Sequence, residues 1–333
     1  MIIVIGATGY VGRYFCCEMK NRGVEVLALG RSKQVLDFFT SNGIKNQFFD
    51  FNQKECFLKL PNTNVEAIID LSAKLAELET PVEDFFSINT LGVYKTLDYA
   101  FKHNIKKVIL TSTHKVYNNV NKKIISENDA ISFQGSHTPY IISKVAAEHF
   151  AEYYNNDYGM NTIVLRLTGV HGYGEILGHL NADGGYLKSA FEIFFERALK
   201  AEPIYVWGNQ AIKRDHIYIK DVVNALYSAV ITKDARGIYN IASGVGYSQY
   251  EEALALSEVF APKGKKSKVY LNEDKQGLTR GYIYSIEKAK KELNWTPKYT
   301  DIFEMYQDYK FEWKRKVYHN YHKFALGQAP ATL

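Results

Sequence analysis

The sequence has few cysteines and no pattern that would pair them. Its three cysteines are Cys16, Cys17 and Cys56, the first two are neighbours, and no CxxC or Cys/His ligand spacing occurs in the 333 residues. Adjacent cysteines are poorly placed to form a disulfide with each other, and a metal site needs a defined ligand spacing. The pattern therefore favours a reducing compartment and predicts no structural metal.

Long apolar runs are also missing. The chain opens on MIIVI, without the basic segment and following apolar stretch of a signal peptide. No apolar run approaches the roughly 18 residues that a membrane-spanning helix needs. We therefore expect a cytoplasmic protein with no signal peptide and no contact with a membrane.

Neither sign of charge dominates. Lysine and arginine number 41 against 36 aspartates and glutamates, a formal net charge of +5, and 46% of the residues are hydrophobic. This is the composition of a globular protein with a sizeable core, and the length suits one large domain or two ordinary ones. Such a small charge excess favours an anionic ligand only weakly and is a poor argument for nucleic-acid binding.

The first half of the chain alternates short β-branched runs with longer amphipathic segments. The runs predict strands at 2–5, 24–29, 47–49, 65–70, 107–111 and 162–166. The segments between them predict helices near 10–22, 33–42, 83–103 and 139–158. Near-continuous apolar strands separated by helices indicate a parallel sheet covered on both faces. The predicted fold class is α/β, doubly wound.

After about residue 170 this rhythm becomes irregular. A glycine-rich loop (172–185) and a predicted helix near 186–200 are followed by short strands and helices. We expect a dinucleotide-binding domain at 1–170, to which a later segment near 210–245 returns. A smaller substrate-binding α/β lobe at 171–325 and a flexible tail at 326–333 complete the predicted organisation.

The C-terminal segment FEMYQDYKFEWKRKVYHNYHKF is aromatic and basic. Its large residues recur at three- and four-residue steps, namely Phe303, Tyr306, Tyr309, Trp313, Val317, Tyr321 and Phe324. One hypothesis is that they stack on the bases of a single-stranded nucleic acid. An amphipathic helix that packs this stripe against the body or a partner subunit explains the spacing without a ligand. We adopt the packing interpretation and expect no nucleic-acid partner.

Residues 6–12 read GATGYVG, directly after the first predicted strand and before a predicted helix. Glycine allows positive φ and a close approach of the backbone to a pyrophosphate. Free N–H groups at the start of the helix point at such an anion. The position of Gly6, Gly9 and Gly12 in a strand–turn–helix unit therefore predicts a dinucleotide phosphate site.

A second motif, TPYIISKVAAEHF, places Tyr140 and Lys144 four residues apart on one face of a predicted helix. A tyrosine hydroxyl has a pKa near 10, and we expect the neighbouring ammonium, together with the positive charge of an oxidised nicotinamide nearby, to lower it. The pair could then exchange a proton with a sugar hydroxyl. About 25 residues earlier, KVILTSTHKVYN ends a strand in hydroxyl residues. Thr113 could share the proton with Tyr140, and Ser112 is the other candidate.

Together these motifs resemble the extended branch of the short-chain dehydrogenase/reductase family, which acts on nucleotide-diphospho-sugars as epimerases, dehydratases and reductases. The resemblance covers about residues 1–300, in order, through GATGYVG, IIDLSA (68–73), NTLGVYKTLDYA (89–100), LTSTHKVY, YIISK, LRLTGVHGYG (165–174), RALKAEPIYVWGNQAIKRDHIYIKDVVNAL (197–226), GIYNIASG (237–244) and YSIEKAKKELNWTPK (284–298). It implies a Rossmann-type fold, a nicotinamide cofactor and a nucleotide-diphospho-sugar substrate. It also implies a homodimer through the helices containing 89–102 and 139–157.

The same resemblance implies roles for individual residues. Thr113, Tyr140 and Lys144 match the catalytic residues of the family, and Thr113 also faces the substrate together with His114 and Lys115. Arg214 and Arg280 match arginines that bind the substrate diphosphate, for which a forked guanidinium is well suited. The implied cofactor-binding residues are Gly6, Thr8, Gly9, Tyr10, Val11, Gly12, Arg31, Ser32, Asp50, Phe51, Leu71, Ser72, Ala73, Asn89, Tyr140, Lys144, Leu167 and Val170.

The residues after Thr113 bear on the reaction. Sugar 4,6-dehydratases of this family carry Asp and Glu there, whereas this sequence has His114 and Lys115. We therefore expect a 4-keto-sugar reductase or a 4-epimerase, in which hydride passes between sugar C4 and the nicotinamide. A dehydratase or epimerase–reductase that uses His114 and Lys115 is the alternative, and His171 or His179 facing C3 or C5 would favour it. A binding protein that senses NAD(P) is the non-enzymatic alternative, although such proteins typically lose the tyrosine or the lysine.

The stretch VLALGRSK (26–33) bears on the cofactor. Arg31 lies 19 residues past Gly12, where an acidic residue would bind both ribose hydroxyls of NAD. Arg31 and Ser32, with Lys33 beside them, would instead bind a 2′-phosphate. We predict a preference for NADP(H), with NAD as the alternative if Arg31 stacks on the adenine or faces solvent.

Overall fold

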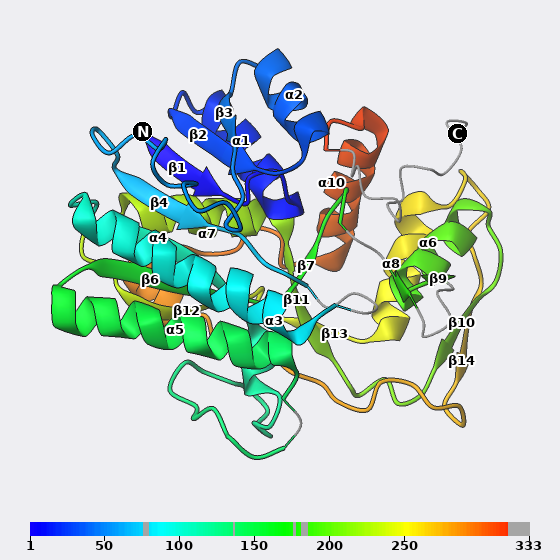
Figure 1. Ribbon diagram of the computed structural model, residues 1–333. Coiled ribbons are helices and arrows are strands. Elements are labelled where there is room, and N and C mark those ends of the chain that lie inside the picture. Colours follow the sequence, from blue (N-terminus) through cyan, green and yellow to red (C-terminus); the bar gives the residue numbers. More distant parts are fainter. Residues whose placement is uncertain (76–79, 136, 176–177, 181–185, 319–333) are drawn as a thin grey trace.

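The computed structural model describes residues 1–318 except 76–79, 136, 176–177 and 181–185. In this part of the chain, seven parallel strands form the central sheet (Figure 1). Their order across the sheet is β12 (Gly237–Ile241), β6 (Asn161–Leu167), β5 (Lys107–Thr113), β4 (Ala67–Asp70), β1 (Ile2–Ile5), β2 (Val26–Gly30) and β3 (Lys45–Phe48). The α/β doubly wound prediction is confirmed, and the predicted strands of the first half all occur.

Helices cover both faces of the sheet, which explains why its strands are apolar on both sides. In β1, Ile2 and Val4 face one side and Ile3 and Ile5 the other, because successive side chains of a strand alternate. The first side packs against α1 (Tyr10–Asn21) and α7 (Ile219–Ile231). The second packs against α4 (Leu91–Lys102) and α5 (Pro139–Tyr158), which lie side by side in Figure 1. The remaining helices of the first half are α2 (Lys33–Ser41), α3 (Val82–Phe85) and the short turns η1 (Phe86–Thr90) and η2 (His114–Tyr117).

The helix expected over residues 83–103 is interrupted. A π-helical turn, η1, separates α3 from α4. Within it, the amide of Asn89 bonds Lys74 on one side and Ser143 on the other. The wider turn therefore directs Asn89 into a buried position between two neighbouring segments, and a propensity pattern does not report such a contact.

The second half builds a smaller set of elements beyond the carboxyl ends of the main strands. Among the described residues these elements include three small sheets. The first consists of β7 (Gly169–His171), β11 (Arg214–Tyr218) and β13 (Gly246–Tyr247). The second pairs β10 (Ile204–Trp207) with β14 (Val269–Asn272), and the third pairs β8 (His179–Leu180) with β9 (Tyr186–Leu187). The helices of this part are α6 (Ala190–Leu199), α8 (Gln249–Phe260) and α10 (Ile302–Arg315), whereas α9 (Glu287–Leu293) packs against β12 and α7. The helix expected from 186 starts at Ala190, after the Ser189 cap. Strand β12 returns to the main sheet, while the domain limits at 170 and 325 stay a prediction.

The aromatic C-terminal stripe lies on α10, which packs against α6 and α8. Tyr306 and Tyr309 are fully buried and contact the rings of Phe195 and Phe260. This is the arrangement that the packing interpretation predicts. The stripe is shorter than expected, because Phe303 and Val317 are exposed, whereas Tyr321 and Phe324 lie outside the described residues. In the described part of the chain, every helix is too short or too polar to cross a bilayer.

Candidate active site

The glycine loop joins β1 to α1, and its glycines are required by close contacts. Gly6 has a φ of +76°, and a Cβ there would lie 2.7 Å from the backbone nitrogen of Ser72. A Cβ on Gly12 would lie 2.5 Å from the Cα of Ala7, so this glycine lets α1 approach the loop. Helix α1 begins directly after Gly9, with its first N–H groups turned toward the loop. The loop therefore has the geometry of an anion-binding strand–turn–helix unit.

A cavity of about 180 Å³ lies beside this loop, at the carboxyl ends of β1, β2 and β4. We call it the glycine-loop cavity. The predicted cofactor residues that line it are Gly6, Thr8, Gly9, Arg31, Asp50, Phe51, Leu71, Ser72 and Ala73. The sequence reasoning missed Ile5, Gly30, Phe49 and Ile88, which also line it. Gly30 had a signal in the sequence, because glycine is rare inside an apolar strand and often marks a close approach. A Cβ on it would lie 2.4 Å from the side chain of Thr8.

Several predicted cofactor residues lie away from the surface of this cavity. The Ser32 hydroxyl caps α2 by accepting from the N–H of Val35 (3.5 Å). The Tyr10 side chain turns toward the smaller lobe, where its oxygen limits the space at Gly172. Asn89 is fully buried behind the wall and bonds the backbone of Lys74. Gly12 serves helix packing, and Val11, Leu167 and Val170 lie on α1, β6 and β7 outside the cavity lining. The expectation that these side chains contact the cofactor therefore receives no support from the cavity.

The predicted catalytic residues converge at the ends of β5 and α5. Tyr140 is the second residue of α5, whose start is fixed by Pro139 and by the Thr138 cap. The side chain of Tyr140 hydrogen-bonds Thr113, the last residue of β5. Lys144, one turn further along α5, donates to the carbonyl oxygens of Ser72 (3.4 Å) and Thr111 (3.0 Å). Because Ser72 also lines the glycine-loop cavity, Lys144 joins α5, which carries the predicted catalytic Tyr140, to the wall of that cavity.

Burial dominates the electrostatics of Tyr140 in the protein alone. Burial raises the pKa of Tyr140, and the hydrogen bond with Thr113 opposes it only in part. Lys144 does not lower that pKa, because its ammonium is directed at two carbonyl groups and attracted by the buried Asp70 and Glu148. Burial lowers the pKa of Lys144 itself to about 8. Lys144 therefore carries its charge below about pH 8 and loses it more readily than a surface lysine.

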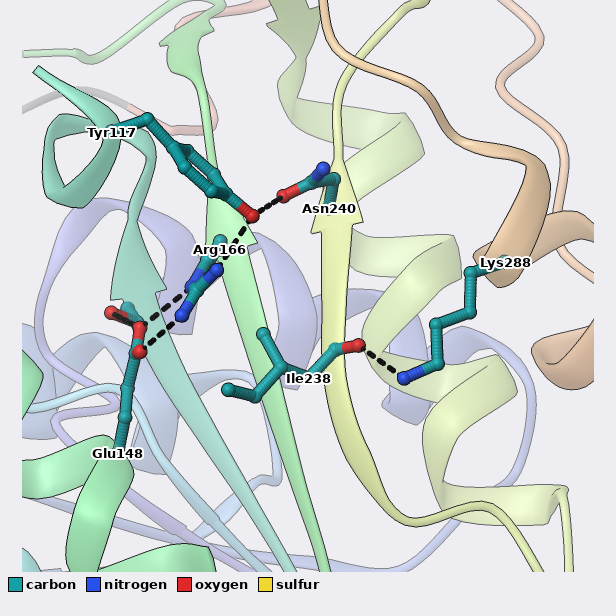
Figure 2. A network of polar contacts seen from close by, with 7 residues as sticks. Tyr117, Glu148, Arg166, Ile238, Asn240 and Lys288 are labelled. Atoms are coloured by element: carbon teal, nitrogen blue, oxygen red, sulfur yellow. Dashed lines mark hydrogen bonds and ion pairs between the residues drawn. The ribbon is translucent and has the colours of Figure 1, made fainter. Parts of the chain in front are cut away.

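Ser112, the alternative hydroxyl, faces a buried polar network and not the site. Its hydroxyl donates to Glu148, which forms a two-pronged ion pair with Arg166 at 3.0 and 2.6 Å. Arg166 also donates to the hydroxyl of Tyr117, which in turn donates to Asn240 (Figure 2). The network ties α5 to β5, β6 and β12 directly behind Thr113. Thr113 is therefore the hydroxyl that remains for a substrate.

His114 and Lys115 follow Thr113 in η2, and their surroundings differ. The Nδ1 atom of His114 lies 2.9 Å from the hydroxyl of Tyr284. Burial lowers the pKa of His114 to about 3, and the nearby cations Lys115, Arg214 and Arg280 add to the effect. His114 is therefore neutral at physiological pH, and the Lys115 side chain is exposed to solvent. The side chain of His179 lies outside the described part of the structure.

Arg214 and Arg280, the two predicted diphosphate ligands, are used differently. Arg214 lines a cavity of about 210 Å³, which we call the Arg214 cavity, with His171, His216 and Glu252 among its other lining residues. The guanidinium of Arg280 instead donates to the carbonyl oxygens of Tyr117, Asn118 and Val120. Arg280 therefore stabilises the turn after η2, and its predicted contact with a diphosphate receives no support.

A larger cavity of about 750 Å³ adjoins the Arg214 cavity, with which it shares Gln249 and Leu278. We call it the Trp207 cavity. Trp207 and Tyr205 project from β10 into it, and each ring is faced by a cation, Lys275 at 4.6 Å and Arg197 at 5.8 Å. The sequence reasoning missed all four residues, although alternation along β10 with buried Ile204 and Val206 was a signal.

The doubly wound sheet, the glycine loop and the adjoining Thr113–Tyr140–Lys144 group define a dinucleotide-binding oxidoreductase type of protein. The family model described as "NAD dependent epimerase/dehydratase family" matches residues 2–242. The chain belongs to this family, and the resemblance seen in its motifs is confirmed.

Individual relatives are similar over nearly the whole chain. A UDP-glucose 4-epimerase of Halalkalibacterium halodurans is 24% identical over 339 residues, which cover 96% of this chain and 97% of that protein. A dTDP-4-dehydro-6-deoxyglucose reductase of Escherichia coli is 22% identical over 315 residues, 89% of this chain and 92% of that protein. The crystal structure of a UDP-N-acetylglucosamine 4-epimerase from Bacillus cereus superimposes with a TM-score of 0.76 at 22% identity, covering 93% of this chain and 98% of that one. This likeness shows the Rossmann-type fold.

Proposed function

We propose that this protein is an NAD(P)-dependent enzyme that acts at C4 of a nucleotide-diphospho-sugar, as a 4-epimerase or a 4-keto-sugar reductase. The observation that carries the proposal is the interaction of the Thr113 and Tyr140 side chains, with Lys144 on the same helix donating to Ser72 in the wall of the glycine-loop cavity. The similarity to 4-epimerases and to a 4-keto-sugar reductase supports the same reaction types. A protein that only senses NAD(P) would have no need of this hydroxyl pair.

The residues of the glycine-loop cavity fit a nicotinamide dinucleotide. Any side chain at Gly6 or Gly30 would fill the space between the loop and its neighbours. The N–H groups at the start of α1 suit a pyrophosphate, and Asp50 and Phe51 form the wall opposite the loop. When bound, the nicotinamide supplies the hydride chemistry at the sugar carbon. A solved UDP-glucuronic acid 4-epimerase of the same fold, with a TM-score of 0.69 at 19% identity, was crystallised in complex with NAD.

In this mechanism the protein's own residues bind the C4 oxygen of the sugar and transfer its proton. The Thr113 hydroxyl binds the C4 oxygen of the sugar, and Tyr140 takes the hydroxyl proton from that oxygen or returns it. The Lys144 ammonium holds the cofactor-side loop by donating to the carbonyl oxygen of Ser72. Because burial favours the neutral phenol, Tyr140 is well suited to donate a proton to a 4-keto oxygen.

The Trp207 cavity is suited to the nucleoside of the substrate. Aromatic faces such as those of Trp207 and Tyr205 stack on a base, and the cations Lys275 and Arg197 beside them attract phosphates. The adjoining Arg214 cavity then receives the diphosphate. A standard dehydratase is disfavoured, because the neutral His114 and the exposed Lys115 stand where two carboxylates act in dehydratases.

The proposed cofactor preference is NADP(H) over NAD. Arg31 lines the glycine-loop cavity at the end of β2 and is exposed there, so its guanidinium is free to meet a 2′-phosphate. Replacing Arg31 by Asp repels that phosphate and offers a carboxylate to the ribose hydroxyls. We predict that Arg31→Asp shifts the ratio of NADP to NAD affinity by at least about tenfold toward NAD, measured by fluorescence titration. Equal affinity of the wild type for both cofactors contradicts the preference.

The proposed assembly is a homodimer through α4 and α5. Both helices expose large apolar side chains on the outside of the sheet layer, namely Leu91, Tyr94, Phe101, Ile142 and Tyr153. Two such helices per subunit would form a four-helix contact that covers these side chains. A monomeric mass in solution would refute this assembly. The proposed location stays cytoplasmic, which the three unpaired cysteines support.

The decisive test of the reaction is Tyr140→Phe. Nucleotide-sugars and their 4-keto forms are screened for turnover and for a change in nicotinamide absorbance, after the co-purified cofactor has been identified. We predict that the variant loses at least about a hundredfold in turnover, because the proton-transferring hydroxyl is gone. Cofactor affinity is expected to survive, since Tyr140 lies outside the lining of the glycine-loop cavity. A fully active variant would falsify the mechanism.

A further inference from the structure

The Arg214 cavity contains a pair of histidines that the proposed reaction does not use. His171 on β7 and His216 on the neighbouring strand β11 both line the cavity. Their rings are 4.5 Å apart between centroids, at an angle of 71°. Both side chains come from strands of one sheet, so the pair is held by backbone pairing and not by a loose loop.

The position of His216 depends on Gly169. The two residues are opposite each other in the β7–β11 pairing. A Cβ on Gly169 would lie 2.6 Å from Nδ1 of His216, so only glycine leaves room for this imidazole. The Nδ1 atom is buried and faces the backbone of Gly169.

The charges around the pair are nearly balanced. Burial lowers the pKa of His171, but the carboxylates of Glu175, at 3.4 Å, and of Glu252 outweigh it and raise that pKa overall. Burial lowers the pKa of His216, and the neighbouring His171, His114 and Arg214 lower it further.

Glu252 is the acidic residue among the described residues that line the cavity. Burial raises its pKa, while its carboxylate accepts from the hydroxyl of Tyr306 (2.8 Å). With His171 matched by Glu175 and His216 neutral, Arg214 is the one permanent cation among the described residues that line the cavity.

Two helix starts add positive potential to the same cavity. Ser189 and Ser248 are the N-caps of α6 and α8, and both line it. The amino end of a helix carries a partial positive charge that favours an anion. Because the elements that meet here are an arginine, two imidazoles and two helix starts, the chemistry suits phosphate oxygens.

We propose that His171 and His216 bind the substrate diphosphate beside Arg214, and that His216 takes up a proton when the diphosphate binds. This inference rests on the proposed function, because it assigns further ligands to the same substrate. A diphosphate diester brings two negative charges, of which Arg214 balances one. The remaining charge favours the protonated form of the nearest neutral base, which is His216.

The test is calorimetry on the full-length protein with UDP-glucose and with dTDP-glucose at pH 7.5. These ligands are chosen because both of their phosphates are esterified and do not titrate near pH 7.5. Any protons taken up on binding are therefore bound by the protein. Titrations in Tris and in HEPES, which differ in ionisation enthalpy, give the number of protons taken up. For the wild type we expect an uptake of up to about one proton, and a Kd that rises up to about tenfold per pH unit above neutrality.

His171→Gln and His216→Gln keep a polar side chain but cannot titrate. We expect the proton uptake to fall to near zero in His216→Gln and to decrease in His171→Gln. In both variants the affinity for either ligand should be weakened at least about threefold. His103→Gln is the matched control, because His103 lies between the end of α4 and the start of β5, at the amino ends of the strands and outside the lining of the Arg214 cavity. Its uptake and affinity should equal those of the wild type.

The outcomes separate this inference from the proposed function. Tight binding of either nucleotide-sugar without proton uptake by the wild type overturns the inference and leaves the proposed function standing. An uptake that persists in both histidine variants, or that disappears in His114→Gln, also overturns it. Failure of the wild type to bind either ligand overturns the inference together with the proposed substrate class.

Discussion

The buried ion pair of Glu148 and Arg166 is the interaction whose loss we expect to cost most. Their side chains are 5% and 4% exposed, and two hydrogen bonds join them. The pair also binds the hydroxyl of Ser112, and Figure 2 shows its bond to the hydroxyl of Tyr117, so its remaining polar atoms have partners. Removing one partner leaves the other charge buried without compensation, which typically costs 3–5 kcal/mol, or roughly a third of the stability of an ordinary domain.

Glu148→Gln is the single replacement that tests this, because it keeps the size of the side chain and removes its charge. We expect the free energy of unfolding in urea to fall by about 3 kcal/mol or more. Arg166→Met should cost a similar amount, since it leaves the Glu148 carboxylate unpaired. The double variant should cost clearly less than the two single costs together, with a coupling of at least about 1 kcal/mol.

Glu152→Gln is the control on the same helix, because Glu152 is exposed and bonds only Asn156 among the described residues. It should change the unfolding free energy by less than about 0.5 kcal/mol. If Glu148→Gln costs no more than this control, or if the two single costs simply add, the charges of the network do not stabilise the fold as argued.

Two further predictions concern His114 and Gly30. The pKa of His114 is about 3 in the folded protein and about 6.5 in an unfolded chain. Between these values only the unfolded chain binds the proton, so His114 destabilises the fold progressively as the pH falls below 6.5, by up to about 1.4 kcal/mol per unit. His114→Gln should therefore lose about 2 kcal/mol less stability than the wild type between pH 7 and 5 in urea titrations, and identical losses would refute the assignment. Gly30→Ala places a Cβ 2.4 Å from the Thr8 side chain, so cofactor affinity should fall at least about tenfold. Thr8→Ala should restore part of it, and no rescue would mean that the clash is not the cause.

Most of the fold could be predicted because its signals are local. The strands predicted at 2–5 and 107–111 contain the continuous apolar runs IIVI and VIL, and a strand that is buried on both faces needs little else. Glycine spacing in GATGYVG and the step between Tyr140 and Lys144 are likewise fixed by short-range geometry. Strand β12 was harder, because GIYNI is short, contains Asn240 and follows the irregular second half.

The remaining features depend on contacts between distant segments. Arg280 binds carbonyl oxygens more than 150 positions away in the chain, so its sequence position could not distinguish it from a diphosphate ligand. The same holds for Lys144, whose ammonium is directed by the carbonyls of Ser72 and Thr111 and not by the neighbouring phenol. A motif predicts which residue types meet, whereas burial and competing partners decide what their pKa values become.

The alternation of side chains along β5 distinguishes Ser112 from Thr113 without the family resemblance. Along β5, Val108 and Leu110 pack on the side of α4 and α5, while Ile109 packs on the opposite side. By alternation, Ser112 lies on the same face of the strand as Val108 and Leu110 and faces α5, where its hydroxyl donates to Glu148. Thr113 then turns away from that network at the end of the strand, toward the start of α5 and Tyr140. The parity of the strand alone therefore assigns one hydroxyl to the fold and leaves the other for the substrate.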